Sequence, residues 1–159
     1  TVTRHSLVNM KRLTTVADAA SDSDSGWYIN LDPGERVHID PTSNNGKIVW
    51  ATAIPSTDPC ASGAIGRAYA REFETGKTLI VNTAATGNTP LNYWQFDADV
   101  VDQKFVLVPA AQANSGGQAS NAGAVEGAVF TDSKGNTTIL RFADLPPSLR
   151  RIHWREILD

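Results

Sequence analysis

The feature that most constrains the fold of this chain is the close spacing of its clusters of turn-forming residues. Clusters of Gly, Pro, Asn, Asp and Ser recur at residues 32–34, 43–46, 86–90 and 114–117. Such clusters interrupt helices and leave room for short strands joined by tight turns. The intervals between them are rich in β-branched and aromatic residues, and several alternate apolar with polar side chains, as a strand with one buried face does. The sequence therefore predicts an all-β fold of antiparallel sheets.

One predicted strand is ambiguous. Residues 7–20 contain Leu, Val, Ala and Met in a spacing that would also suit a helix, and we expect a strand over residues 7–16. The other predicted strands are clearer because turn signals bound them on both sides. They span residues 26–31, 36–40, 47–54, 67–73, 77–82, 105–109, 124–131, 137–142 and 151–157.

A weak internal repeat bears on how the strands are arranged. A strand, strand and turn pattern in residues 47–77 returns as strand, turn and strand in residues 127–142. Repeated small antiparallel sheets predict blades of a β-propeller, because a single blade cannot cover its own apolar face. A small β-sandwich or barrel would give the same pattern. On the propeller interpretation, residues 1–159 form a single β module of about two blades, residues 1–82 and 83–159.

Composition excludes several classes of protein. The formal net charge is -3 and no block of Lys and Arg is present, so nucleic acid has no basic surface to bind. No apolar run is long enough to span a bilayer as a helix. Cys60 is the only cysteine, which excludes an internal disulfide and a cysteine-based zinc site.

An ordered set of motifs is more specific than the composition. Gly26-Trp27-Tyr28 is followed by Gly34-Glu35-Arg36-Val37, by Asp40-Pro41 and by Ile54-Pro55-Ser56-Thr57-Asp58-Pro59-Cys60, and the chain closes on Arg151-Ile152-His153-Trp154-Arg155-Glu156-Ile157. This order resembles the C-terminal propeller region of the PilC/PilY adhesins found at type IV pilus tips. The resemblance implies PQQ-like blades, here as a partial β-propeller.

The resemblance also implies a function. The chain would be an extracellular structural and adhesion module of the pilus at the cell surface, acting in pilus assembly and surface attachment by protein-protein docking. Its partners would be minor pilins, copies of itself, or another polypeptide that completes the propeller. Two other interpretations stay open, which are a self-assembling subunit of an extracellular filament and a non-catalytic, quinoprotein-like propeller fragment.

The same resemblance directs attention to one acidic stretch. Members of the family often carry a calcium loop of the form Asp-x-Asn-x-Asp-Gly, and here Asp97, Asp99 and Asp102 are the corresponding candidate ligands. They lack the Gly that makes the sharp turn of such a loop, so a solvated acidic loop is favoured over a calcium site. We expect no other cofactor.

No arrangement of nucleophile, base and acid points to catalysis. The histidines are scattered, no Gly-x-Ser-x-Gly motif accompanies them, and Cys60 lies in a Pro-rich loop without an identifiable base. The sequence therefore predicts a protein that is not an enzyme. The tryptophans are expected to pack between blades. Trp50 and Trp154 are the candidates to lie on an interface with a partner or close behind it.

Overall fold

The structure, a computed structural model, describes residues 9–56, 63–82, 89–108 and 125–142. These residues form strands, turns and loops, and none of them is helical. The predicted all-β class is therefore confirmed. The strands are β1 (Lys11–Arg12), β2 (Trp27–Tyr28), β3 (Arg36–Val37), β4 (Thr42–Asn44), β5 (Lys47–Pro55), β6 (Ala64–Glu72), β7 (Val81–Asn82), β8 (Thr89–Pro90), β9 (Trp94–Phe96), β10 (Val100–Val108), β11 (Val125–Asp132) and β12 (Thr137–Arg141).

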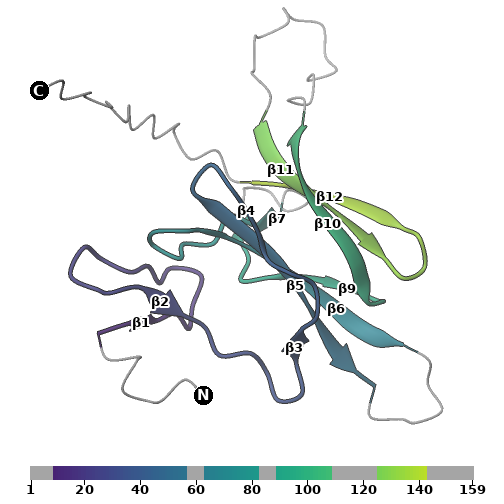
Figure 1. Ribbon diagram of the computed structural model, residues 1–159, viewed down its shortest axis with the longest axis horizontal. Coiled ribbons are helices and arrows are strands. Elements are labelled where there is room, and N and C mark those ends of the chain that lie inside the picture. The colour runs from purple at the N-terminus through teal and green to yellow at the C-terminus, as the bar shows by residue number, and fades with distance from the viewer. Residues whose placement is uncertain (1–8, 57–62, 83–88, 109–124, 143–159) are drawn as a thin grey trace, which may run out of the picture.

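A five-stranded antiparallel sheet is built around the long pair β5 and β6 (Figure 1). These two strands pair over their full lengths, from Lys47 opposite Glu72 to Pro55 opposite Ala64. The short strands β3 and β4 share the other edge of β5, and β9 pairs with β6. The strand β5 is thus central, with partners on both sides.

The hairpin between β4 and β5 shows how local sequence sets register. Asn45 and Gly46 are the two loop residues, with φ angles of 47° and 72°. A two-residue hairpin turn with positive φ at both positions is the type that matches strand twist, and Asn-Gly is the dipeptide that adopts it most readily. The register that follows places Val49 toward the protein core, where it is fully buried.

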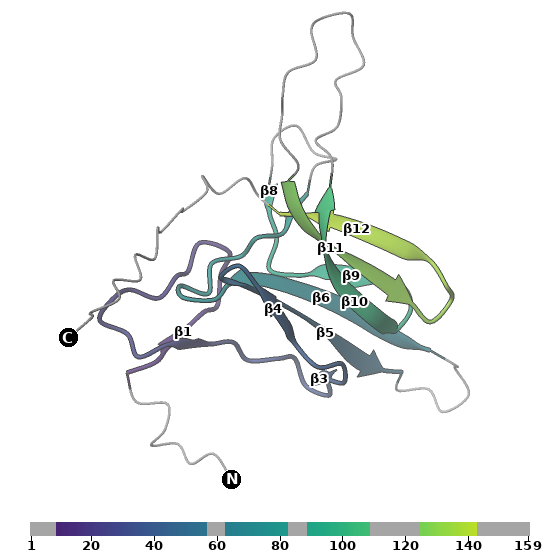
Figure 2. The same ribbon diagram turned by 45° about the horizontal axis from the view of Figure 1, so that its top comes forward.

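A second, three-stranded antiparallel sheet has the order β10-β11-β12 and lies across the first sheet (Figure 2). The apolar core lies between the two sheets. Small residues of β5 and β6 meet large residues of the second sheet there, and the rings of Phe96 and Phe130 are 6.0 Å apart. The buried core consists of Val49, Ala51, Ala68, Ala70, Leu79, Ile80, Phe96, Val100, Ala128, Phe130, Leu140 and Phe142.

The opposite face of the five-stranded sheet is covered by the N-terminal segment that carries β1 and β2, which pair with each other in parallel. Trp27 stacks on Trp50 of β5 with ring centroids 6.3 Å apart, and its Nε1 donates a hydrogen bond to the carbonyl oxygen of Phe73. Leu13 is buried nearby at 4% exposure. This segment therefore adds a layer on the side of the sheet away from the apolar core.

Strand positions agree with the sequence where the apolar pattern is strong and differ where it is weak. The predicted strands at residues 47–54, 124–131 and 137–142 are confirmed as β5, β11 and β12. The strand expected over residues 7–16 is reduced to the two residues of β1 in its described part. Two-residue strands also replace the longer ones expected at residues 26–31 and 36–40, because each pairs with its neighbour over only two positions.

Several further differences have identifiable causes. The strand β10 begins at Val100, earlier than expected, because a bulge between Val100 and Asp102 breaks the alternation that a sequence pattern would show. The strands β4, β8 and β9 were not predicted, since short edge strands take their pairing from a neighbour. The strand predicted at residues 151–157 lies outside the described residues.

The predictions about how the strands assemble concern the division into blades and the closure of the sheets. The five-stranded sheet takes β9 from beyond residue 82, and the division into two propeller blades stays a prediction. The sheets of the described residues are open and form no closed barrel. Within the part of the chain that the structure describes, no helix is long and apolar enough to cross a membrane.

Candidate functional site

The strand β6 has two chemically different faces. Ala68 and Ala70 point into the core and are fully buried, so alternation places Arg67, Tyr69 and Arg71 on the opposite face. These three side chains line a cavity of about 240 Å³. Its other walls come from the N-terminal segment and from the loop before β9, and they include Arg12, Leu13, Thr14, Ile29, Asn30, Asp32, Glu35, Asn92 and Tyr93.

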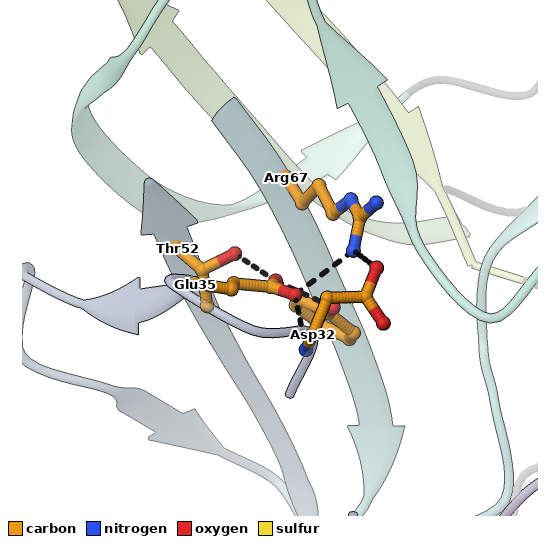
Figure 3. A network of polar contacts seen from close by, with 5 residues as sticks. Asp32, Glu35, Thr52 and Arg67 are labelled. Carbon is orange, nitrogen blue, oxygen red and sulfur yellow. Dashed lines mark hydrogen bonds and ion pairs between the residues drawn. The ribbon is translucent and has the colours of Figure 1, made fainter. Parts of the chain in front are cut away.

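Glu35 is the centre of a buried polar network beside this cavity (Figure 3). Its Oε1 accepts hydrogen bonds from the hydroxyl of Thr52 at 2.5 Å and from the hydroxyl of Tyr69 at 2.7 Å. Its Oε2 accepts from Nη1 of Arg67 at 2.8 Å and from the backbone N–H of Asp32 at 3.0 Å. A buried carboxylate is tolerated when its lone pairs are satisfied in this way.

Arg67 completes the network through two carboxylates. The same Nη1 lies 2.7 Å from Oδ2 of Asp32, whose side chain is 62% exposed. Burial disfavours the charged guanidinium, but the hydrogen bond to Asp32 and the charge of Glu35 outweigh that effect and raise the pKa of Arg67. Burial, reinforced by the hydrogen bond to Glu35, also raises the pKa of Tyr69. Arg67 is therefore charged and Tyr69 neutral throughout the physiological range.

Aromatic rings support the network from the side. Tyr69 stacks on Trp50 with centroids 4.9 Å apart and parallel planes, and it meets Tyr93 at 5.7 Å. The guanidinium carbon of Arg67 lies 4.2 Å above the ring of Tyr93, which is a cation–π contact. These contacts hold the polar side chains of the cavity in defined positions.

Arg71 differs from Arg67 in its partners. The residue is 2% exposed, and its Nη1 donates to the carbonyl oxygen of Gly76 at 2.6 Å. Its Nη2 lies 3.3 Å from Oδ1 of Asn92, and its Nε has no hydrogen-bond partner among the described residues. Burial lowers the pKa of Arg71.

The candidate calcium ligands are not gathered around one point. Asp97 and Asp99 precede β10, whereas Asp102 lies on that strand and pairs with Lys104 at 3.2 Å. Oδ1 of Asp99 lies 3.1 Å from Nε2 of His38. Among the described residues, no group of three or more His, Cys, Asp or Glu side chains could hold a metal ion. That these acids form a solvated loop and not a calcium site stays a prediction.

Of the two tryptophans predicted to lie at an interface, the structure describes only Trp50. Trp50 is 7% exposed and lies in the aromatic stack between Trp27 and Tyr69, so a partner could meet it only through the layer that covers it. Trp154 lies outside the described residues, as does Cys60. The role of both tryptophans at an interface stays a prediction.

The outward side of the three-stranded sheet carries apolar side chains at the surface. Register places Val129 of β11 opposite Ile139 of β12, on the side away from the buried Ala128 and Leu140. Ile139 is 54% exposed and Val129 is half-buried. We call this surface the outer face, defined by Lys104, Val106, Val129, Ile139 and Arg141.

Sequence reasoning did not identify the cavity. Before the fold was known, Glu35 stood out only as part of the Gly34-Glu35-Arg36-Val37 motif. Arg67 and Arg71 were only members of a predicted strand. The signal that could have found them is the alternation of Arg, Tyr and Arg with small residues in β6, which predicts a polar face opposite a close-packed one. The partner Asp32 could not be assigned without the fold, because it lies 35 residues away from Arg67.

The chain was compared with protein families, curated proteins and solved structures. No protein-family model, no curated protein and no solved structure matches the chain.

Proposed function

We propose that the chain is an extracellular structural and adhesion module of a type IV pilus tip, which acts in pilus assembly and surface attachment by docking to other proteins. The ordered motifs from Gly26 to Cys60 support the pilus assignment through their resemblance to PilC/PilY adhesins. The proposal requires no catalytic step and no cofactor.

The observation that carries the docking mechanism is the outer face. Val106, Val129 and Ile139 lie on one side of a regular sheet, with the basic side chains of Lys104 and Arg141 beside them. An apolar centre with a charged rim is the usual composition of a protein-protein interface. A regular sheet also holds these side chains in place before binding, which lowers the entropy cost of association.

The ion pairs of the cavity also favour a binding protein over an enzyme. Glu35 and Arg67 would be the natural acid and cation of a reaction, yet each is bound to the other and Glu35 accepts from three further donors. A carboxylate engaged in this way has no free lone pair with which to take a proton from a substrate. Its role is to hold the loop before β3 against β5 and β6.

Site-specific photocrosslinking in the producing cells tests the proposal. A photoreactive amino acid at position 139 should give adducts with a pilin subunit or with another segment of a pilus adhesin, because the side chain at this position lies in the outer face. The same probe at Glu74, an exposed residue in the turn after β6, is the matched control and should give none. Equal labelling at the two positions, or none at either, would contradict docking through the outer face.

The identity of the crosslinked partner also distinguishes a pilus tip module from a filament subunit. Adducts with copies of this chain alone would favour a self-assembling filament subunit over a pilus tip module. Protease treatment of intact cells tests location independently, since an extracellular module should be degraded while cytoplasmic proteins survive.

A further inference from the structure

Arg71 is a buried cation that no carboxylate of the described residues contacts, and the charge of Asp18 acts on it only from beyond ion-pair distance. It borders the cavity and is 2% exposed, yet no Asp or Glu of the described chain lies within ion-pair distance. Arg67, four residues earlier on the same face of β6, contacts both Asp32 and Glu35. A buried charge without a counter-charge in contact with it is unfavourable. The difference between the two arginines points to an anion that enters the cavity from outside.

The guanidinium of Arg71 has donors left for such an anion. A guanidinium has five N–H donors. Of those on Arg71, one bonds to the carbonyl oxygen of Gly76 at 2.6 Å and another meets Asn92 at the long distance of 3.3 Å. The Nε has no partner among the described residues, but this atom is fully buried. The part-buried Nη2 is therefore the group that can donate to a carboxylate at the cavity edge, without loss of the stronger contact to Gly76.

The rest of the cavity limits the kind of anion. Asp32 lines it with a side chain that is 62% exposed, and only Oδ2 of that carboxylate is used by Arg67. A carboxylate in the wall repels a second anionic group and accepts hydrogen bonds from hydroxyl groups. The amide side chains of Asn30 and Asn92 line the same space and can both donate and accept. The wall therefore suits one anionic group accompanied by hydroxyls.

We propose that this cavity binds a small hydroxylated carboxylate, of the size of a uronic acid, with its carboxylate on Arg71 and its hydroxyl groups toward Asp32 and Asn30. The volume of about 240 Å³ is below the range of about 300–1,000 Å³ that is typical of drug-sized ligands, which favours a single sugar acid over an oligomer. This assignment is independent of the docking function, because the cavity and the outer face belong to different sheets.

Titration of the whole chain with glucuronate, glucose and inorganic phosphate tests the assignment. Heteronuclear NMR should show glucuronate shifting the side-chain amide signals of Asn30 and Asn92, with an affinity that falls as salt is added. Glucose lacks the anion and phosphate lacks the hydroxyl-bearing frame, so each should bind at least about tenfold more weakly. No shift with glucuronate at millimolar concentration would overturn the proposal, as would phosphate binding equal to that of glucuronate.

A pair of arginine variants tests whether Arg71 binds the carboxylate of glucuronate. Arg71→Met keeps most of the aliphatic stem, and we expect it to fold and to lose glucuronate affinity by about tenfold or more. Arg141→Met makes the same change on the other sheet and should bind glucuronate as the unchanged protein does. Equal affinity in the two variants would refute the role of Arg71. If Arg71→Met does not fold, the comparison of glucuronate with glucose on the unchanged chain still decides the matter.

Discussion

At the scale of single residues, Glu35 joins three parts of the chain that are distant in sequence. Its carboxylate receives hydrogen bonds from Thr52 on β5, from Tyr69 and Arg67 on β6 and from the backbone of Asp32. Since the side chain of Glu35 is fully buried, each of these donors loses a partner that water cannot replace when the carboxylate is removed. The residue therefore stabilises the fold as well as the wall of the cavity.

Replacement of Glu35 tests this role. Glu35→Gln replaces a charge with an amide beside Arg67, and we expect the free energy of unfolding to fall by about 3–5 kcal/mol, as when one partner of a buried pair is lost. Urea denaturation measures the change. Glu74→Gln is the control, because Glu74 is exposed and should change stability by less than about 0.5 kcal/mol. A loss of less than 1 kcal/mol in Glu35→Gln would show that the network is not stabilising.

Three other carboxylates have lowered pKa values, which make the free energy of unfolding depend on pH. Backbone hydrogen bonds from Thr14 lower the pKa of Asp18, and those from Ser21 lower the pKa of Asp24. The side chain of Asn136, with backbone N–H groups, lowers the pKa of Asp132. Each pKa is lower in the folded than in the unfolded chain, so the stabilisation is complete above the unfolded value of about 3.9 and is lost as pH falls through the folded value.

The expected outcome is a melting temperature that begins to fall below about pH 4 as these carboxylates take up protons. Thermal melts between pH 7 and pH 2 measure it. Asp132→Asn removes one of the groups and should make the acid-induced decrease smaller while lowering stability at pH 7. A melting temperature that is constant down to pH 2 would contradict the assigned role of these hydrogen bonds.

At the scale of elements, the turn after β6 determines how closely the N-terminal segment can pack. Gly76 has a φ of 69°, and a Cβ there would lie 2.4 Å from Cδ1 of Leu13 and 2.6 Å from Cδ2 of Trp27. The carbonyl of the same residue accepts the hydrogen bond of Arg71. A single glycine thus allows the covering layer and the cavity wall to meet.

Two glycine variants separate backbone strain from packing. Gly135→Ala places a Cβ in open space at a φ of 84°, so only strain of about 1 kcal/mol is expected. Gly76→Ala adds the overlap with Leu13 and Trp27, and we expect it to cost at least about 1–3 kcal/mol more, as overpacking does. Urea denaturation followed by tryptophan fluorescence gives both values. Equal losses in the two variants would mean that the N-terminal segment does not pack closely on this turn.

How much the sequence predicts differs from element to element. The strands β5, β11 and β12 were found within one or two residues, because turn residues bound them and their apolar patterns are strong. The start of β6 was missed because Ala64, Ile65 and Gly66 carry no alternation of apolar and polar side chains. The cavity was beyond reach, since it depends on the pairing of β6 with distant segments. The acidic stretch from Asp97 was predicted as one loop, whereas Asp102 belongs to a strand.

At the scale of the whole molecule, the exposure of two adjacent residues of β12 shows which face of the three-stranded sheet packs on the core. Ile139 is 54% exposed on the outer face, whereas Leu140 is 6% exposed beneath it. We expect Ile139→Lys to leave the melting temperature nearly unchanged, because an exposed site costs less than about 0.5 kcal/mol. Leu140→Lys should prevent folding, since it buries an unpaired charge. Circular dichroism melts compare them, and equal destabilisation would refute the assigned faces.

The alanines that line β5 and β6 have a consequence for how chains of this kind can diverge. Ala51, Ala68 and Ala70 are fully buried against the second sheet, so any larger side chain there would push the two sheets apart. Side chains on the outer face meet no such limit. Related chains should therefore vary freely at the positions of Val106 and Ile139 and keep small residues at the three alanines. Recognition can then evolve to suit new partners while the architecture that presents it stays the same.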